Sequence, residues 1–246
     1  MNLPKIDLPT YELELPSSGK KITFRPFLVK EQKILLMAME SKKEIDSINA
    51  VKQIVSNCIL DKNFDVNEMS SFDLEYFFIQ LRMRSIGEKI SLSFTCKNIV
   101  SENQECNNLM QFEYDLTNTT VEKNPEHTKT IFFTKDVGVV MKYPSFRITE
   151  NLIQNTKSKK TSVENALDLI VDCIDYFFDK ENVYHVKEMS KQELTDYVEN
   201  IPKTSFDKME KFFDTIPQVK SIVNHKCKKC GFEHAIPVEG LSNFFE

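Results

Sequence analysis

Residues 225–232 read HKCKKCGF, and the two cysteines in this stretch are the most specific chemical signal in the chain. Cys227 and Cys230 form a C-x-x-C motif followed by glycine, which is how a zinc knuckle turns so that main-chain N–H groups point at the thiolates. A second pair, Cys96 and Cys106, lies in the longer stretch FTCKNIVSENQEC. We predict that the four thiolates bind one structural zinc ion, because a catalytic zinc needs an open coordination position and four thiolates leave none.

Several alternatives to this site remain open from the sequence. His225 and His234 flank the C-terminal pair, and either can replace one of the N-terminal cysteines as a ligand. A redox C-x-x-C would make the chain a thiol oxidoreductase, but that chemistry usually places its first cysteine at a helix N-terminus, whereas the flanks here predict a hairpin. The simplest alternative is a set of unligated cysteines. Metal binding is favoured by the neighbouring lysines, which lower cysteine pKa and offset the charge of about −2 on a four-thiolate zinc site: Lys97, Lys226, Lys228 and Lys229.

Composition describes an ordinary soluble, folded protein. Of the 246 residues, 41% are hydrophobic and 28% are charged, which is too apolar for a disordered chain. The formal net charge of −5 and the absence of a basic stripe disfavour nucleic-acid binding. No apolar stretch approaches the ~20 residues of a membrane helix, so we expect no membrane partner. Cys58 and Cys173 lie within apolar helical patterns and are expected to pack there.

Hydrophobic periodicity predicts an α+β fold: a helix-rich body with small antiparallel sheets and hairpins. The N-terminal half, residues 1–144, is expected to contain a hairpin, three helices and a cysteine-bearing sheet. Its predicted elements are a hairpin at 11–26, helices at 29–42, 44–60 and 71–85, and strands in ISLSFTC, LMQFEYDL, TKTIFFT and VGVVMKYP, with NIVSENQE as a loop.

The C-terminal half, residues 145–246, is expected to contain helices and the zinc-knuckle hairpin. Its predicted elements are a long helix at 163–178, helices at 190–200 and 205–213, the hairpin SIVNHKC with FEHAIPV, and a docked apolar end, LSNFFE. Short matches relate the two halves: NAVKQIV to NALDLIV, and VNEMS to VKEMS. We therefore expect two similarly built halves, joined by the four-cysteine site into one integrated domain.

Enzyme activity has no positive support in the sequence. The five glycines stand far apart, which excludes a phosphate-binding loop, and neither H-E-x-x-H nor G-x-S-x-G occurs. His127 and His185 lie in polar contexts and are expected at the surface. Aromatic-rich runs such as LEYFFIQLRM are expected to be mostly core, with some at an interface. We predict a protein that is not an enzyme and acts through protein contacts.

The segment at residues 22–42, ITFRPFLVKEQKILLMAMESK, resembles the N-terminal signature of the baseplate hub proteins of T4-like contractile-tailed phages. In that family a hairpin leads through F-R-P-F into a helix of the K-E-x-K-x-L-L-x-A-x-E-S type. The resemblance extends over most of the chain, including the cysteine-bearing strands and a terminal aromatic pair, Phe244 and Phe245. The signature positions are Phe24, Arg25, Pro26, Phe27, Lys30, Glu31, Lys33, Leu35, Leu36, Ala38, Glu40 and Ser41.

The resemblance implies a late tail protein, either a hub subunit retained in the baseplate or an assembly factor for the hub. Its implied partners are other baseplate hub and tail proteins. Its implied location is the virion tail baseplate, or the host cytoplasm during assembly. The family provides no catalytic motif to transfer. The alternative hypothesis is a zinc-containing nucleic-acid-binding or regulatory module, which the net acidity disfavours.

Overall fold

The computed structural model describes residues 4, 6–41, 43–102, 104–155 and 161–238. Among these, the chain forms two compact units. Unit 1 takes the residues up to Val66, then Phe72–Glu122, and those from Val219 onward; unit 2 takes Asn67–Ser71 and Lys123–Gln218. Phe244, Phe245 and the rest of the predicted apolar end lie outside the described residues.

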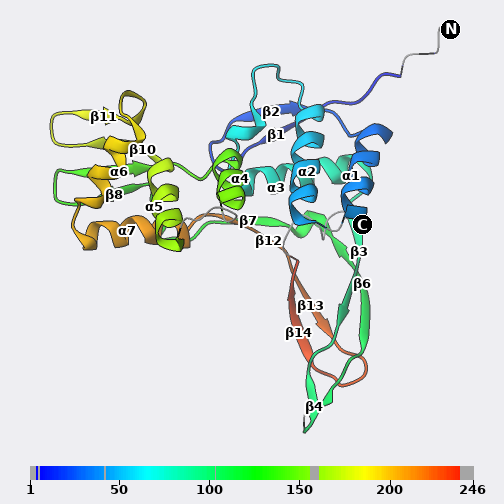
Figure 1. Cartoon of the computed structure of the whole chain (residues 1–246). Coiled ribbons are helices and arrows are strands. Elements are labelled where there is room, and N and C mark those ends of the chain that lie inside the picture. The colour runs from blue at the N-terminus through cyan, green and yellow to red at the C-terminus, as the bar shows by residue number, and fades with distance from the viewer. Residues whose placement is uncertain (1–3, 5, 42, 103, 156–160, 239–246) are drawn as a thin grey trace. The chain divides into compact units, whose positions relative to one another are not determined.

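The first part of unit 1 is a hairpin followed by three helices, as the sequence predicted. The hairpin strands pair antiparallel, from Tyr11 opposite Phe24 to Glu14 opposite Lys21. Helix α3 is buried on most of its sides, with Phe77 and Phe78 completely covered, which is typical of a helix surrounded by other elements. These elements are β1 (Tyr11–Glu14), β2 (Lys21–Phe24), α1 (Val29–Ser41), α2 (Glu44–Cys58), the 3₁₀ helix η1 (Val66–Glu68) and α3 (Ser71–Ser85) (Figure 1).

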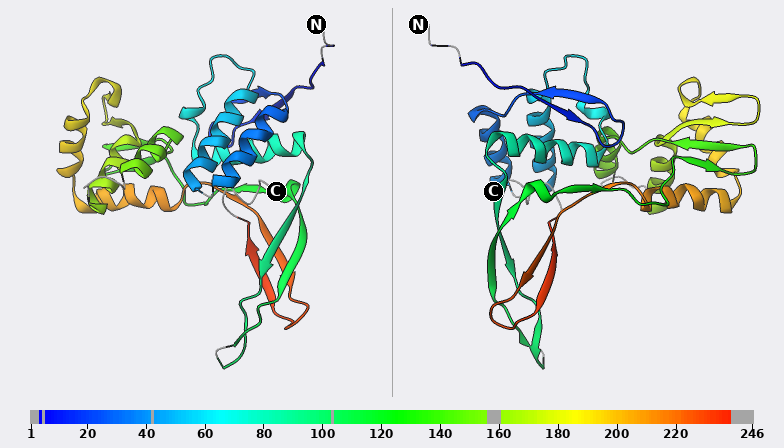
Figure 2. Two further views of the ribbon diagram at one scale, coloured as in Figure 1. Left: turned by 45° about the vertical axis from the view of Figure 1, so that its right-hand side comes forward. Right: turned by 180° about the vertical axis from the view of Figure 1, so that it is seen from behind.

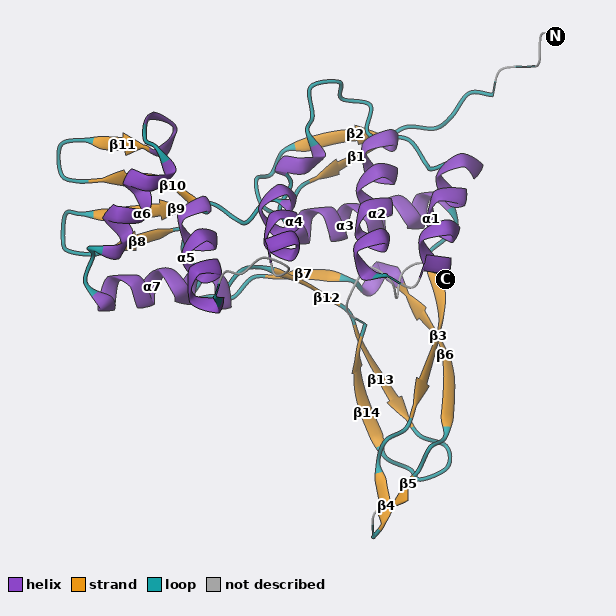
Figure 3. Ribbon diagram, in the orientation of Figure 1, coloured by secondary structure: helices purple, strands orange, loops and turns teal. Residues whose placement is uncertain are grey.

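The second part of unit 1 consists of two hairpins, which we call the thiol arm. Strands β3 (Lys89–Thr95) and β6 (Leu109–Asp115) form one, and β13 (Ile222–Lys226) and β14 (Glu233–Pro237) form the other. Burial alternates along each strand, so every second side chain faces inward. The hairpins lie side by side in both views of Figure 2, and Figure 3 shows that this part of the chain contains only strands and connections.

The connection between Cys96 and Cys106 is more ordered than the predicted loop. It forms a small hairpin of β4 (Ile99–Ser101) and β5 (Gln104–Glu105). After β6, the chain passes through the 3₁₀ helix η2 (Leu116–Asn118) to β7 (Thr120–Glu122), which pairs with β12 (Gln218–Lys220). Most of unit 2 is thus an insertion between two paired strands.

Unit 2 contains a four-stranded sheet whose buried side chains pack with those of the helices. The strand order is β11-β10-β9-β8, so the predicted pair β8–β9 belongs to a larger sheet. Its core includes Ile131 and Val139 from the sheet, with Leu194 and Met209 from helices. The elements are β8 (Thr130–Phe132), β9 (Gly138–Met141), α4 (Phe146–Asn155), α5 (Ser162–Asp172), β10 (Ile174–Phe178), β11 (Val183–His185), the 3₁₀ helix η3 (Val186–Glu188), α6 (Lys191–Glu199) and α7 (Lys203–Asp214).

The predicted helix at 163–178 is wrong in its second part. Helix α5 ends at Asp172, Cys173 caps it, and Ile174–Phe178 continues as strand β10. The apolar residues Ile174 and Phe177 follow Ile170 at helical spacing, so the sequence pattern continues past the end of α5. Aromatic residues favour strands, and pairing with β9 places Phe177 opposite Val139 in the core.

The α+β class is confirmed, but the compact units do not follow the boundary between residues 144 and 145. All four cysteines of the predicted site belong to unit 1, although they come from both halves of the sequence. The short repeats share local structure, because VNE and VKE form the 3₁₀ helices η1 and η3. The order of elements differs between the copies, since β10 and β11 separate α5 from η3.

Candidate metal centre

The ends of the two hairpins of the thiol arm bring the four predicted cysteines together. Their sulfur atoms all lie within 4.8 Å of one another. The Cys96 and Cys230 sulfurs are 3.7 Å apart, and the Cys106 and Cys227 sulfurs are 3.8 Å apart. Cys230 is half-buried and the other three are buried. All four are free cysteines.

This arrangement fits a tetrahedral metal ion. Zinc bound to four thiolates at about 2.3 Å requires neighbouring sulfurs to be about 3.8 Å apart. The Cys96–Cys230 and Cys106–Cys227 sulfur pairs come within about 0.1 Å of that value, and all four sulfurs lie within 4.8 Å of one another. Each pair also joins one cysteine of the first hairpin to one of the second, so an ion held here would link β3–β6 to β13–β14.

The two histidines considered as alternative ligands lie outside the group of four sulfurs. The His234 ring is 5.5 Å from the Phe94 ring, and its Nε2 is 3.1 Å from the Cys96 sulfur, within hydrogen-bonding distance. His225 stacks on Phe112 with ring centroids 5.0 Å apart. Both imidazoles therefore form part of the inner face of the arm, next to the cysteines.

The knuckle geometry makes the Cys227 thiol more acidic than an ordinary cysteine. Main-chain N–H groups of Cys230 and Lys229 donate to its sulfur, and these bonds lower the pKa of Cys227 to about 6. Burial instead raises the pKa of Cys96 to about 12. Gly231, at a φ of 76°, provides the left-handed turn that the knuckle requires.

Two asparagines near the sulfurs were missed in the sequence. The side-chain amide of Asn98 donates to the Cys230 sulfur, and that of Asn108 donates to the Cys227 sulfur. Both asparagines lie two residues after a cysteine, in CKN and CNN. The sequence does not show which cysteine sulfur each asparagine side chain reaches, because that depends on how the two hairpins meet. Lys229, expected to balance charge, donates to the main-chain carbonyl of Cys106 at 2.8 Å.

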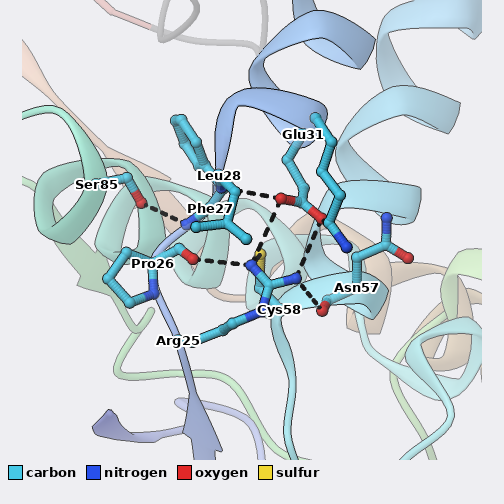
Figure 4. Close-up of polar contacts among 9 residues, drawn as sticks. Arg25, Pro26, Phe27, Leu28, Glu31, Asn57, Cys58 and Ser85 are labelled. Atoms are coloured by element: carbon cyan, nitrogen blue, oxygen red, sulfur yellow. Dashed lines mark hydrogen bonds and ion pairs between the residues drawn. The ribbon is translucent and has the colours of Figure 1, made fainter. Parts of the chain in front are cut away.

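The F-R-P-F signature forms a second polar cluster, in the first part of unit 1. Arg25 donates to the Glu31 carboxylate at 3.1 Å, and also to the carbonyls of Pro26 and Asn57 (Figure 4). Glu31 also accepts the main-chain N–H of Leu28. These contacts tie the residues after β2 to the start of α1 and the end of α2.

This second cluster is structural in character. The Glu31 side chain is fully buried and the Arg25 side chain is 12% exposed. Burial raises the pKa of Glu31, but hydrogen bonds from Arg25 and Leu28 outweigh that effect, so the pKa lies below its ordinary value. Glu31 is therefore ionised and paired at neutral pH, and the signature segment is part of the core.

The structure tests four predictions about single residues. Cys58 and Cys173 are buried at the ends of α2 and α5, as expected. His185 is exposed as expected, whereas His127 is only partly exposed. His127 is half-buried in unit 2, where its two ring nitrogens contact the hydroxyls of Thr215 and Tyr143 at 2.9 and 3.1 Å.

No helix in the described part of the chain is long and apolar enough to cross a membrane.

Comparison with known proteins agrees with the resemblance in the signature segment. The chain is similar to the baseplate hub assembly protein gp26 of Enterobacteria phage T4, with 24% identity over 237 residues that cover 96% of this chain and 98% of that protein. No solved structure matches the chain. The family model for the T4 bacteriophage base plate protein matches residues 8–246. The chain therefore belongs to the T4 bacteriophage base plate protein family.

Proposed function

We propose that this protein acts in phage tail morphogenesis, as a baseplate hub subunit or as a factor that assembles the hub. The observation that carries the proposal is the similarity to a baseplate hub assembly protein over nearly the full length of both chains. A match of that extent supports a shared role for the two whole proteins, since a small module in common would cover only part of each sequence. The partners are then other baseplate hub and tail proteins.

The proposed mode of action is protein–protein contact without catalysis. The most chemically distinctive cluster among the described residues consists of four thiols. Four thiolates would fill the coordination sphere of a zinc ion and leave no position for water or substrate. Such a site supports a structural role, which suits a protein that must present a fixed surface to its partners.

We further propose that Cys96, Cys106, Cys227 and Cys230 bind one zinc ion. The two close sulfur pairs, at 3.7 and 3.8 Å, match the edge of a zinc–thiolate tetrahedron. Bound zinc would provide a closed, redox-inert cross-link between the two hairpins of the thiol arm. The residues around it orient the sulfurs and keep water from three of them.

Deletion and complementation in the phage test the function. Without the protein, we expect tail assembly to stop at the hub stage, and we expect the wild-type chain supplied in trans to restore it. Tagged protein from infected cells should co-purify with other hub or tail proteins. Normal baseplates in its complete absence would overturn the proposal.

The two proposed roles differ in where the protein is found. A retained hub subunit belongs to the virion tail baseplate, whereas an assembly factor acts in the host cytoplasm and leaves. Quantitative mass spectrometry of purified tails separates the roles. A fixed stoichiometry with hub proteins supports the subunit, and depletion from finished tails, with enrichment in assembly intermediates, supports the factor.

A further inference from the structure

Asn98 and Asn108 occupy equivalent places around the four cysteines. Each follows a cysteine by two residues, and its main-chain N–H donates to the sulfur of that cysteine, Cys96 or Cys106. Each main-chain carbonyl then accepts the N–H of the other cysteine, at 2.8 Å from Cys106 to Asn98 and 2.9 Å from Cys96 to Asn108. The first hairpin of the thiol arm thus contains a reciprocal pair of C-x-N turns.

The side chains of these asparagines cross to the second hairpin. Asn98 Nδ2 lies 3.7 Å from the Cys230 sulfur, and Asn108 Nδ2 lies 3.5 Å from the Cys227 sulfur. The opposite amide orientation would direct a carbonyl oxygen at a thiolate, which is electrostatically unfavourable. Each asparagine therefore donates to both sulfurs of one close pair, through its main chain to one and through its side chain to the other.

Donors of this kind matter because the site is buried and rich in negative charge. A zinc ion with four thiolates carries a charge of about −2, and buried charge is costly unless it is hydrogen-bonded. N–H groups directed at the sulfurs disperse that charge and fix the side-chain rotamers of the ligands. A donor that reaches across from one hairpin to the other also opposes separation of the two sulfurs of a pair, and therefore of the two hairpins.

We propose that Asn98 and Asn108 are positioning residues of the metal centre, which set its metal affinity by donating across the two hairpins to Cys230 and Cys227. This inference rests on the proposed zinc site. It goes beyond the ligand set, because the asparagine amides donate to the sulfurs and would act on the metal through them.

Zinc affinity of the full-length chain, measured by competition with a chromogenic chelator, tests the inference. Asn98→Asp and Asn108→Asp keep the side-chain shape and replace the N–H donor with an anionic acceptor. We expect each to weaken zinc binding by about 10- to 100-fold. Asn107→Asp is the matched control: it adds the same charge beside Cys106, at an exposed position, and should leave affinity within about twofold of wild type.

Alanine variants separate electrostatic positioning from packing. If the asparagines only fill space, Asn98→Ala should bind zinc more weakly than the isosteric Asn98→Asp. If they donate to thiolates, Asn98→Asp should bind zinc more weakly than Asn98→Ala, because it places a negative charge against the sulfur. The same order is expected at Asn108. Circular dichroism of each zinc-loaded variant checks that the chain is folded.

The experiment distinguishes failure of the asparagine inference from failure of the zinc site itself. A wild-type chain that binds no zinc overturns the site and this inference together. A wild-type chain that binds zinc, with Asn98→Asp and Asn108→Asp equal to Asn107→Asp, overturns only the inference. Aspartate variants that bind zinc more tightly than the alanine variants would also overturn it.

Discussion

The thiol arm of unit 1 and the core of unit 2 are stabilised in different ways. The arm's buried cluster contains five residues, three of which are the ligand candidates Cys96, Cys106 and Cys227. The cluster in unit 2 contains twelve buried residues, of which one is a cysteine. Two thin hairpins with so few buried apolar side chains need a further stabilising link, whereas a sheet covered by helices does not. The comparison therefore predicts that the arm needs the proposed zinc ion for its stability and that unit 2 does not.

Loss of a proposed zinc ligand should reduce stability the most, and it should do so only in the thiol arm. We expect about one zinc ion per wild-type chain and essentially none in Cys227→Ser. The arm should then unfold, because structural zinc contributes on the order of 10 kcal/mol to the folding of small metal-bound modules. Metal analysis and chemical unfolding measure the two effects. Cys173→Ser is the control for a buried thiol in unit 2, and it should retain zinc.

Breaking the buried ion pair of the signature segment should have the next largest effect. Glu31→Gln removes the partner of Arg25 in a nearly dry site, so we expect a loss of about 4 kcal/mol from the free energy of unfolding. Glu40→Gln makes the same chemical change on the exposed face of α1 and should cost less than about 0.5 kcal/mol. Equal stability of the two variants in urea unfolding would contradict the structural role of the cluster.

A cavity in the core of unit 2 should destabilise that unit without affecting metal binding. Met209 is fully buried, and Met209→Ala should cost about 3 kcal/mol. Met37→Ala, at a methionine that is 60% exposed on α1, provides the matched control with a small effect. If Met209→Ala also abolished zinc binding, the arm and the unit 2 core would not be independent in the way the comparison requires.

The smallest expected effect is a pH dependence of unit 2 through His127. Burial, together with the charge of Lys129, lowers the pKa of His127 below its ordinary value near 6.5. The unfolded chain therefore binds the proton more readily, so the stability contribution is complete above about pH 6.5 and is lost as pH falls through the folded-state pKa.

We expect the melting temperature of unit 2 to fall by about 4 °C or less between pH 7.5 and pH 5.5. His127→Gln should lose this component of the pH dependence. A variant that keeps the full wild-type pH profile would show that another group is responsible.

The sequence predicted most of the local structure of unit 1, because its elements have clear signals. The F-R-P-F stretch separates the first hairpin from α1, and alternation marks β3 and β6. The four cysteines were also predicted to meet, since a C-x-x-C followed by glycine is typical of a zinc knuckle and a closed tetrahedral site needs two further ligands. The family resemblance is confirmed by the match over residues 8–246.

The remaining features depend on contacts between residues far apart in the chain. Nothing near Ile174 shows that it pairs with β9, more than 30 residues earlier, so the end of α5 was misplaced. Asn98 and Asn108 acquire their role only when the second hairpin provides Cys230 and Cys227. The boundaries of the compact units likewise depend on the final hairpin packing in unit 1, which periodicity along the chain does not encode.

Hydrogen–deuterium exchange of the full-length chain, zinc-loaded and after chelation, tests the central claim most directly. We predict that chelation removes protection from the main-chain amides of β3, β6, β13 and β14, while β8–β10 and α5–α7 keep theirs. Unchanged protection in the thiol arm after zinc is removed would contradict a metal-dependent arm. Loss of protection throughout the chain would contradict the contrast between the two regions.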